Sequence, residues 1–124
     1  MIPYETYKVL HILGVLLAFA TLGGLALTVA NGATKSTSSV RRLIAITHGA
    51  ATFIILLGGF GALARLGIMH GNLPGWVLVK LACWAVLAAL VAIPYRKPAL
   101  ARTIFWLLPV LGGIAVVMAI YKPF

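Results

Sequence analysis

Residues 7–30 read YKVLHILGVLLAFATLGGLALTVA, an apolar stretch whose only basic side chains, Lys8 and His11, stand near its start. About 20 such residues in an α-helix cross a hydrocarbon layer ~30 Å thick. Comparable apolar stretches cover 43–66, 76–94 and 103–121, which leaves almost no chain for a soluble domain. The sequence therefore predicts one transmembrane domain over residues 1–124, all-α in class.

The connections between these four stretches are short. Short connections favour an antiparallel four-helix transmembrane bundle with up-down-up-down topology. The continuous apolar runs do not fit the alternating pattern of a membrane β-barrel. The first stretch lacks a basic start and exceeds the apolar core of a signal peptide, so we expect it to be a retained helix.

Composition agrees with a lipid setting: 63% of residues are hydrophobic, 9% are charged, and the mean hydropathy is +1.12. Lipid, rather than a soluble core, can cover that much apolar surface. Ten Lys and Arg stand against a single acid, Glu5. Nucleic-acid binding is disfavoured, because no soluble segment combines basic with aromatic residues.

The basic residues predict the orientation in the membrane. Six of the ten fall in two connections: Lys35, Arg41, Arg42, Arg96, Lys97 and Arg102. The connection over 67–75 has none. Since cytoplasmic loops are enriched in Lys and Arg, loops 31–42 and 95–102 are expected in the cytoplasm. Both termini are then periplasmic, in a bacterial inner membrane.

Small residues predict where the helices pack. In the second stretch, positions 48, 51, 55, 58, 62 and 65 form a heptad-like seam. Gly58 and Ala62 within it form a small-xxx-small pair that allows close helix approach. Pro109 predicts a kink in the last stretch. The expected packing positions are Gly14, Ala18, Ala51, Gly58, Ala62, Pro109 and Gly113.

Four ionisable residues inside the stretches are candidates for ligand or cofactor binding: His11, His48, Arg65 and Lys80. Charges within a membrane span are costly and usually functional. In the predicted topology His11, Arg65 and Lys80 all lie near the outer boundary. This concentration of cations predicts an anionic group beside Arg65 and Lys80, supplied by lipid, ligand or partner.

The two histidines are also candidate axial ligands of haem b. One haem iron needs two nitrogens only ~4 Å apart, whereas the topology separates His11 from His48 by roughly 15–20 Å in depth. The pair cannot bracket one haem. Separate haems, or His11 with His70, remain open.

No catalytic residues are assigned. The chain has no Asp, one Glu and one cysteine, Cys83, so paired-carboxylate chemistry and a closed metal site lack their side chains. An enzyme is therefore the less favoured interpretation.

Several short motifs resemble the SirB2-like small membrane proteins. They are Lys8-x-x-His11, His48 after a basic flank, Trp76-x-x-x-Lys80, the basic turn Arg96-Lys97, and the closing Lys122. Thr47 and Ala51 stand where that family pattern has Pro and an acid. The resemblance implies a four-span bacterial inner-membrane protein. A remoter similarity, the histidine early in the first helix, links the chain to HemJ-like and CopD-like membrane proteins.

Three functions remain open from the sequence. The first is an accessory or scaffold subunit of a larger membrane complex, with other membrane subunits or further copies of the chain as partners. The second is a haem- or pigment-binding bundle that uses His11 or His48, with Arg65 or Lys80 on the propionates. The third is a small transporter or channel component that uses the helix break at Pro109, Gly112 and Gly113.

Overall fold

The computed structural model describes residues 2–68 and 71–124. Within these ranges every regular element is helical, so the predicted all-α class is confirmed. The elements are α1 (Tyr4–Ala30), α2 (Arg41–Arg65), α3 (Gly75–Leu90), α4 (Ile93–Arg96), the 3-10 helix η1 (Pro98–Leu100) and α5 (Ala101–Tyr121).

Three helical segments are long and apolar enough to cross a membrane, judged by length and composition. They are Tyr4–Ala30, Arg41–Arg65 and Pro98–Tyr121. The 27 residues of α1 extend ~40 Å at 1.5 Å per residue, more than the ~30 Å of hydrocarbon. Three of the four expected stretches therefore meet the requirement as single helical segments.

The stretch expected as one helix over 76–94 is divided. Helix α3 ends at Leu90, a turn follows at Val91 and Ala92, and the chain resumes as α4. Pro94 explains the division, because it has no N–H to donate to the Leu90 carbonyl and its ring crowds that oxygen. The 16 residues of α3 extend only ~24 Å.

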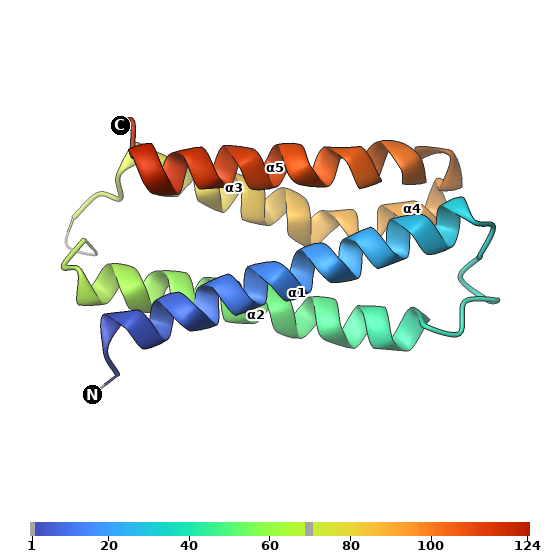
Figure 1. The fold of residues 1–124 in the computed structure, drawn as a ribbon, viewed down its shortest axis with the longest axis horizontal. Coiled ribbons are helices and arrows are strands. Elements are labelled where there is room, and N and C mark those ends of the chain that lie inside the picture. The colour runs from blue at the N-terminus through green and yellow to red at the C-terminus, as the bar shows by residue number, and fades with distance from the viewer. Residues whose placement is uncertain (1, 69–70) are drawn as a thin grey trace.

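The helices pack lengthwise around α1. Helix α1 packs along α2, and α5 packs against both α1 and α3, whereas α2 and α3 meet over a short region. Figure 1 shows both termini at the same end as the α2–α3 connection, with the other two connections at the opposite end. The largest buried cluster joins α1, α3 and α5 through Leu22, Ala26, Cys83, Leu87, Leu90, Ile104, Leu108 and Leu111.

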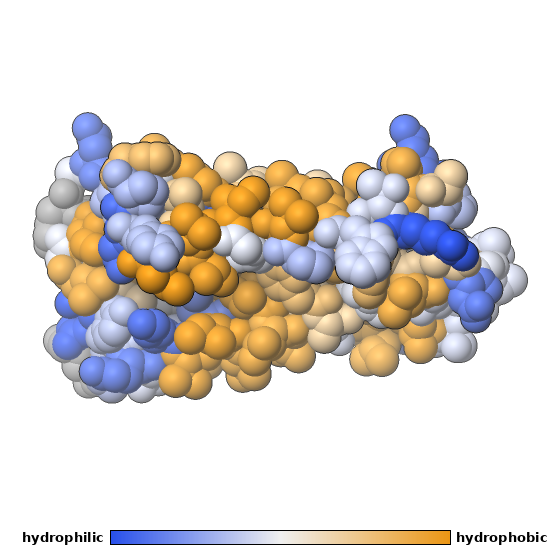
Figure 2. Space-filling model, turned by 45° about the horizontal axis from the view of Figure 1, so that its top comes forward, coloured by the Kyte–Doolittle hydropathy of each residue, from blue (hydrophilic) through white to orange (hydrophobic). Residues whose placement is uncertain are grey.

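Large apolar side chains also cover the outside of the protein. Trp106 is 70% exposed, Phe53 65% and Leu16 62%. Figure 2 shows apolar residues across the middle of the molecule and hydrophilic residues gathered at its two ends. Soluble proteins rarely expose an apolar surface of this extent. The exterior has the composition expected of a surface that faces lipid.

Candidate functional site

Helices α1 and α2 approach each other closely where glycines replace side chains. A Cβ atom on Gly58 would lie 2.5 Å from the backbone nitrogen of His11 and 2.7 Å from the carbonyl oxygen of Tyr7. A Cβ atom on Gly14 would lie 3.0 Å from the backbone nitrogen of Ile55. Backbone therefore packs on backbone here, and His11 is held directly against α2.

This close approach lets His11 form a hydrogen bond between helices. Its Nδ1 lies 2.8 Å from the carbonyl oxygen of Ile55 on α2. A carbonyl can only accept, so Nδ1 must carry the proton and donate. In the neutral ring Nε2 then has a lone pair, the arrangement often found in metal-bound histidines whose second nitrogen is fixed by a carbonyl.

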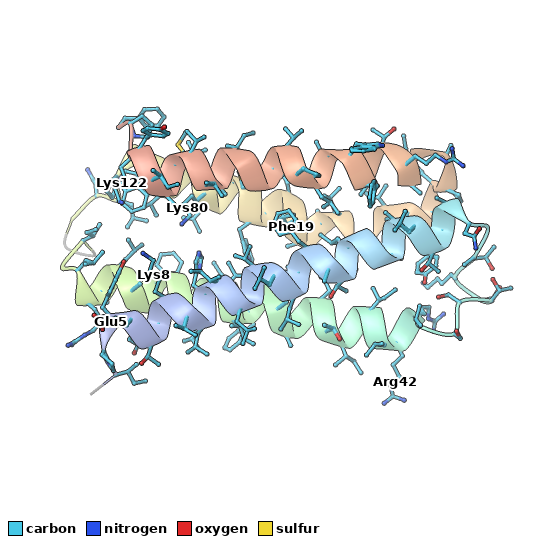
Figure 3. All side chains as sticks on the ribbon, viewed as in Figure 1. Glu5, Lys8, Phe19, Arg42, Lys80 and Lys122 are labelled. Atoms are coloured by element: carbon cyan, nitrogen blue, oxygen red, sulfur yellow. The ribbon has the colours of Figure 1, made fainter. Side chains whose placement is uncertain are left out.

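Three lysines gather at the same end of the molecule as the termini. Lys80, on α3, is half-buried, and it is close enough to Lys8, Lys122 and the His11 ring for their charges to interact. Figure 3 shows the three lysines at this end. We call Lys8, His11, Lys80 and Lys122 the terminal basic cluster.

Aromatic rings offset part of this charge. The Nζ of Lys122 lies 5.3 Å from the centre of the Trp76 ring and 2.8 Å from the Ala119 carbonyl oxygen, to which it donates. The Nζ of Lys8 lies 5.8 Å from the centre of the Tyr4 ring. Such cation–π contacts stabilise an ammonium group. Lys80, the most buried of the three lysines, has no such contact among the residues described.

The remaining residues of this end are placed as follows. Glu5, the only acid in the sequence, is exposed on the first turn of α1. Arg65 is exposed at the last position of α2. His70, considered with His11 as a ligand, lies outside the described residues. The structure thus brings His11 and Lys80 together with two further lysines.

His48 lies in a different part of the bundle and links α2 to α3. It is only 4% exposed, and its Nε2 donates to the Leu87 carbonyl oxygen at 3.0 Å. In return, the Trp84 Nε1 donates to the Thr52 carbonyl oxygen at 3.0 Å. This reciprocal pair of hydrogen bonds connects two helices that contact each other only over a short region.

The two histidines are far apart along the bundle. The His11 backbone lies against Gly58, and His48 is ten residues before Gly58 on α2, or ~15 Å along the helix axis. The two rings cannot ligate one iron atom. Among residues 2–68 and 71–124, no three His, Cys, Asp or Glu side chains are grouped as metal ligands.

Helix α5 presents its proline and one glycine to the outside. It continues without interruption past Pro109, and Figure 1 shows it as one unbroken helix. Pro109 and Gly113 are exposed, and a Cβ atom on Gly113 would meet nothing within 4 Å. Gly112 instead faces α1, where its Cβ would lie 3.3 Å from the Phe19 ring.

Sequence reasoning missed two aromatic residues with polar tips. Trp84 donates across the α2–α3 contact, and the Tyr95 hydroxyl is buried without a hydrogen bond among the described residues. Trp84 stands within an apolar stretch and Tyr95 directly follows it, and a buried Trp or Tyr needs a partner for its N–H or O–H. The need for such a partner could have marked both residues from the sequence, but it does not reveal which helix supplies the hydrogen-bond acceptor.

No protein-family model matches the chain, and neither the curated proteins nor the solved structures include a significant match.

Proposed function

We propose that the chain is an integral protein of the bacterial inner membrane, built as an antiparallel up-down-up-down four-helix bundle. In this proposal α3 and the start of α4 together form the third span, since 75–94 extends ~30 Å at helical rise. The observation that supports membrane insertion is the apolar exterior between two polar ends (Figure 2). Membership of a SirB2-like group is part of the proposal.

The proposed orientation places loops 31–42 and 95–102 in the cytoplasm and both termini in the periplasm. The end with these loops has six Lys and Arg residues. The terminal end has Lys8, Arg65, Lys80 and Lys122, with Glu5. The difference in the number of Lys and Arg between the two ends is modest, but its direction agrees with the enrichment of cytoplasmic loops in cations.

Cysteine labelling tests this orientation. On a Cys83→Ala background, Ser38→Cys should be protected from an impermeant thiol reagent in intact cells, whereas Asn72→Cys should react. Both positions should react after the cells are permeabilised, which controls for accessibility. Labelling of Ser38→Cys with protection of Asn72→Cys in intact cells would invert the orientation.

Within the membrane, we propose that the protein is an accessory or scaffold subunit of a larger complex. The observation that carries this proposal is the terminal basic cluster, in which half-buried Lys80 lies among like charges. At low local dielectric such repulsion exceeds its strength in water. A carboxylate on a partner's membrane helix would relieve it, and intramembrane charges commonly pair in this way.

Native electrophoresis of membranes solubilised in mild detergent tests the subunit proposal. The chain should migrate well above the size of its own detergent complex, and it should shift to that size in a harsh detergent. Mass analysis of the larger band should identify either a second protein or further copies of this chain. Migration only at monomer size in every detergent would contradict the proposal.

Haem binding is the second candidate, because of the geometry at His11. With Nδ1 held by Ile55, Nε2 is the nitrogen that would ligate iron, and Lys8 and Lys80 could neutralise propionates. An absorption spectrum of protein from haem-supplemented cells decides the question. A Soret band that His11→Ala abolishes and His48→Ala leaves would support haem, and a featureless spectrum would exclude it.

A further inference from the structure

A hollow opens at the end of the bundle opposite the terminal basic cluster. Its volume is about 270 Å³, and it lies between α1, the start of α2 and the α3–α4 turn. The polar part of its lining is Lys35, Arg41 and Tyr95, and the apolar part includes Leu25, Ile44 and Val91. The hollow thus has cations on an otherwise apolar wall.

The polar groups of this lining have unused hydrogen-bonding capacity. The Arg41 guanidinium donates one long bond, 3.4 Å, to the Lys35 carbonyl oxygen, although it carries five N–H donors. The Tyr95 hydroxyl, by contrast, is buried beneath the lining and is closed to a bound ligand.

The charge around the hollow favours an anion as its occupant. Lys35 and Arg41 are exposed cations at the rim, and the only acid, Glu5, belongs to the first turn of α1 at the other end. A phosphate offers several acceptor oxygens, enough for the guanidinium of Arg41 and the ammonium of Lys35 together. Basic pockets between membrane helices on the cytoplasmic side bind anionic lipid headgroups in this way.

We propose that this hollow binds the phosphate diester of an anionic phospholipid from the cytoplasmic leaflet. The apolar residues beside the cations favour a lipid over free phosphate, because acyl chains can cover Leu25, Ile44 and Val91 where a hydrated ion cannot. The proposal rests on the membrane insertion proposed above. It does not depend on the subunit role or on haem.

Lipid competition in nanodiscs tests the site. The purified protein is reconstituted in phosphatidylcholine with a small fraction of phosphatidylglycerol, and retained lipid is measured by native mass spectrometry. Wild type should retain phosphatidylglycerol in excess of its bulk fraction. Arg41→Gln should reduce that enrichment about five-fold, as expected for one lost cation–lipid contact.

Arg42→Gln is the matched control. Arg42 is adjacent in sequence and is also exposed, but it does not line the hollow, and Figure 3 shows its side chain directed away from the bundle. This variant should keep the enrichment within a factor of two. Equal losses for Arg41→Gln and Arg42→Gln would show nonspecific attraction to the basic end and would overturn the site.

Two further arms separate this proposal from its alternatives. Inorganic phosphate at millimolar concentration should neither stabilise the protein nor displace the lipid, and stabilisation equal to that of phosphatidylglycerol would overturn the lipid assignment. Extraction of native membranes with alkaline carbonate tests insertion separately. Protein that resists extraction but shows no lipid preference would refute the site alone, whereas release by carbonate would refute the membrane proposal.

Discussion

Replacing Gly58 by leucine should destabilise the protein by about 3 kcal/mol, at the upper end of the range for overpacking. The new Cβ would lie within 2.5–2.8 Å of three backbone atoms, the nitrogen and Cα of His11 and the oxygen of Tyr7. Backbone atoms of a helix cannot rotate away as a side chain would, so α1 would have to separate from α2. Thermal or denaturant unfolding in a fixed detergent measures the loss.

Gly49→Leu is the matched control for this change. Gly49 lies on the same helix, is exposed, and its added Cβ would meet nothing within 4 Å. Because glycine is a poor helix former, that variant should be neutral or slightly more stable than wild type. Equal unfolding free energies for the two variants would contradict the close approach of α1 and α2.

The close contact between α1 and α2 at Gly58 also affects the candidate site. If Gly58 holds the His11 backbone against α2, separation of the helices also breaks the bond from Nδ1 to the Ile55 carbonyl. His11 would then lose its fixed ring orientation. We infer that Gly58 positions His11, although its own atoms make no bond to the ring.

The all-helical class and most helix positions could be predicted because they depend on local composition. Long apolar runs predict long helices, and Asn31-Gly32 predicts the end of α1, where Gly32 has φ +102°. Residues with a Cβ atom rarely adopt that conformation, whereas glycine does so without steric cost. Local sequence was therefore sufficient for the three long apolar helices.

The expected single helix over 76–94 is wrong at its C-terminal end for an identifiable reason. Pro94 affects the carbonyl four residues earlier, so it interrupts the helix well before its own position. The helix accordingly ends at Leu90. The four-residue offset shortens α3 and creates the turn at Val91 and Ala92. Val91 of this turn lines the hollow at the end opposite the termini.

The partners of the buried polar side chains could not be predicted. His11 and His48 donate to carbonyl oxygens of Ile55 and Leu87. Every residue has a carbonyl, so such an acceptor leaves no mark in the sequence. Only the relative rotation of the helices, which depends on the whole bundle, determines which carbonyl each ring reaches.

Lys80→Gln should have opposite effects on the isolated protein and on its complex. In the isolated protein it removes a half-buried charge that is repelled by Lys8 and Lys122. Like charges several ångströms apart at an effective dielectric near 20 repel by a few kcal/mol at most. Solvent screening of the two exposed lysines reduces this repulsion energy. The variant should therefore be more stable than wild type by about 1 kcal/mol.

The complex should respond in the other direction if a partner carboxylate pairs with Lys80. Loss of one member of a desolvated interfacial pair costs about 2 kcal/mol or more, which corresponds to roughly thirty-fold weaker association. Native electrophoresis should then show Lys80→Gln mainly at monomer size, whereas the exposed, opposite-end variant Lys97→Gln keeps the larger band. A simple folding defect would lower both the stability of the isolated protein and the affinity of the complex. Only a gain in stability together with a loss of affinity supports pairing of Lys80 with a partner carboxylate. Retention of the complex by Lys80→Gln would remove the terminal basic cluster from the interface.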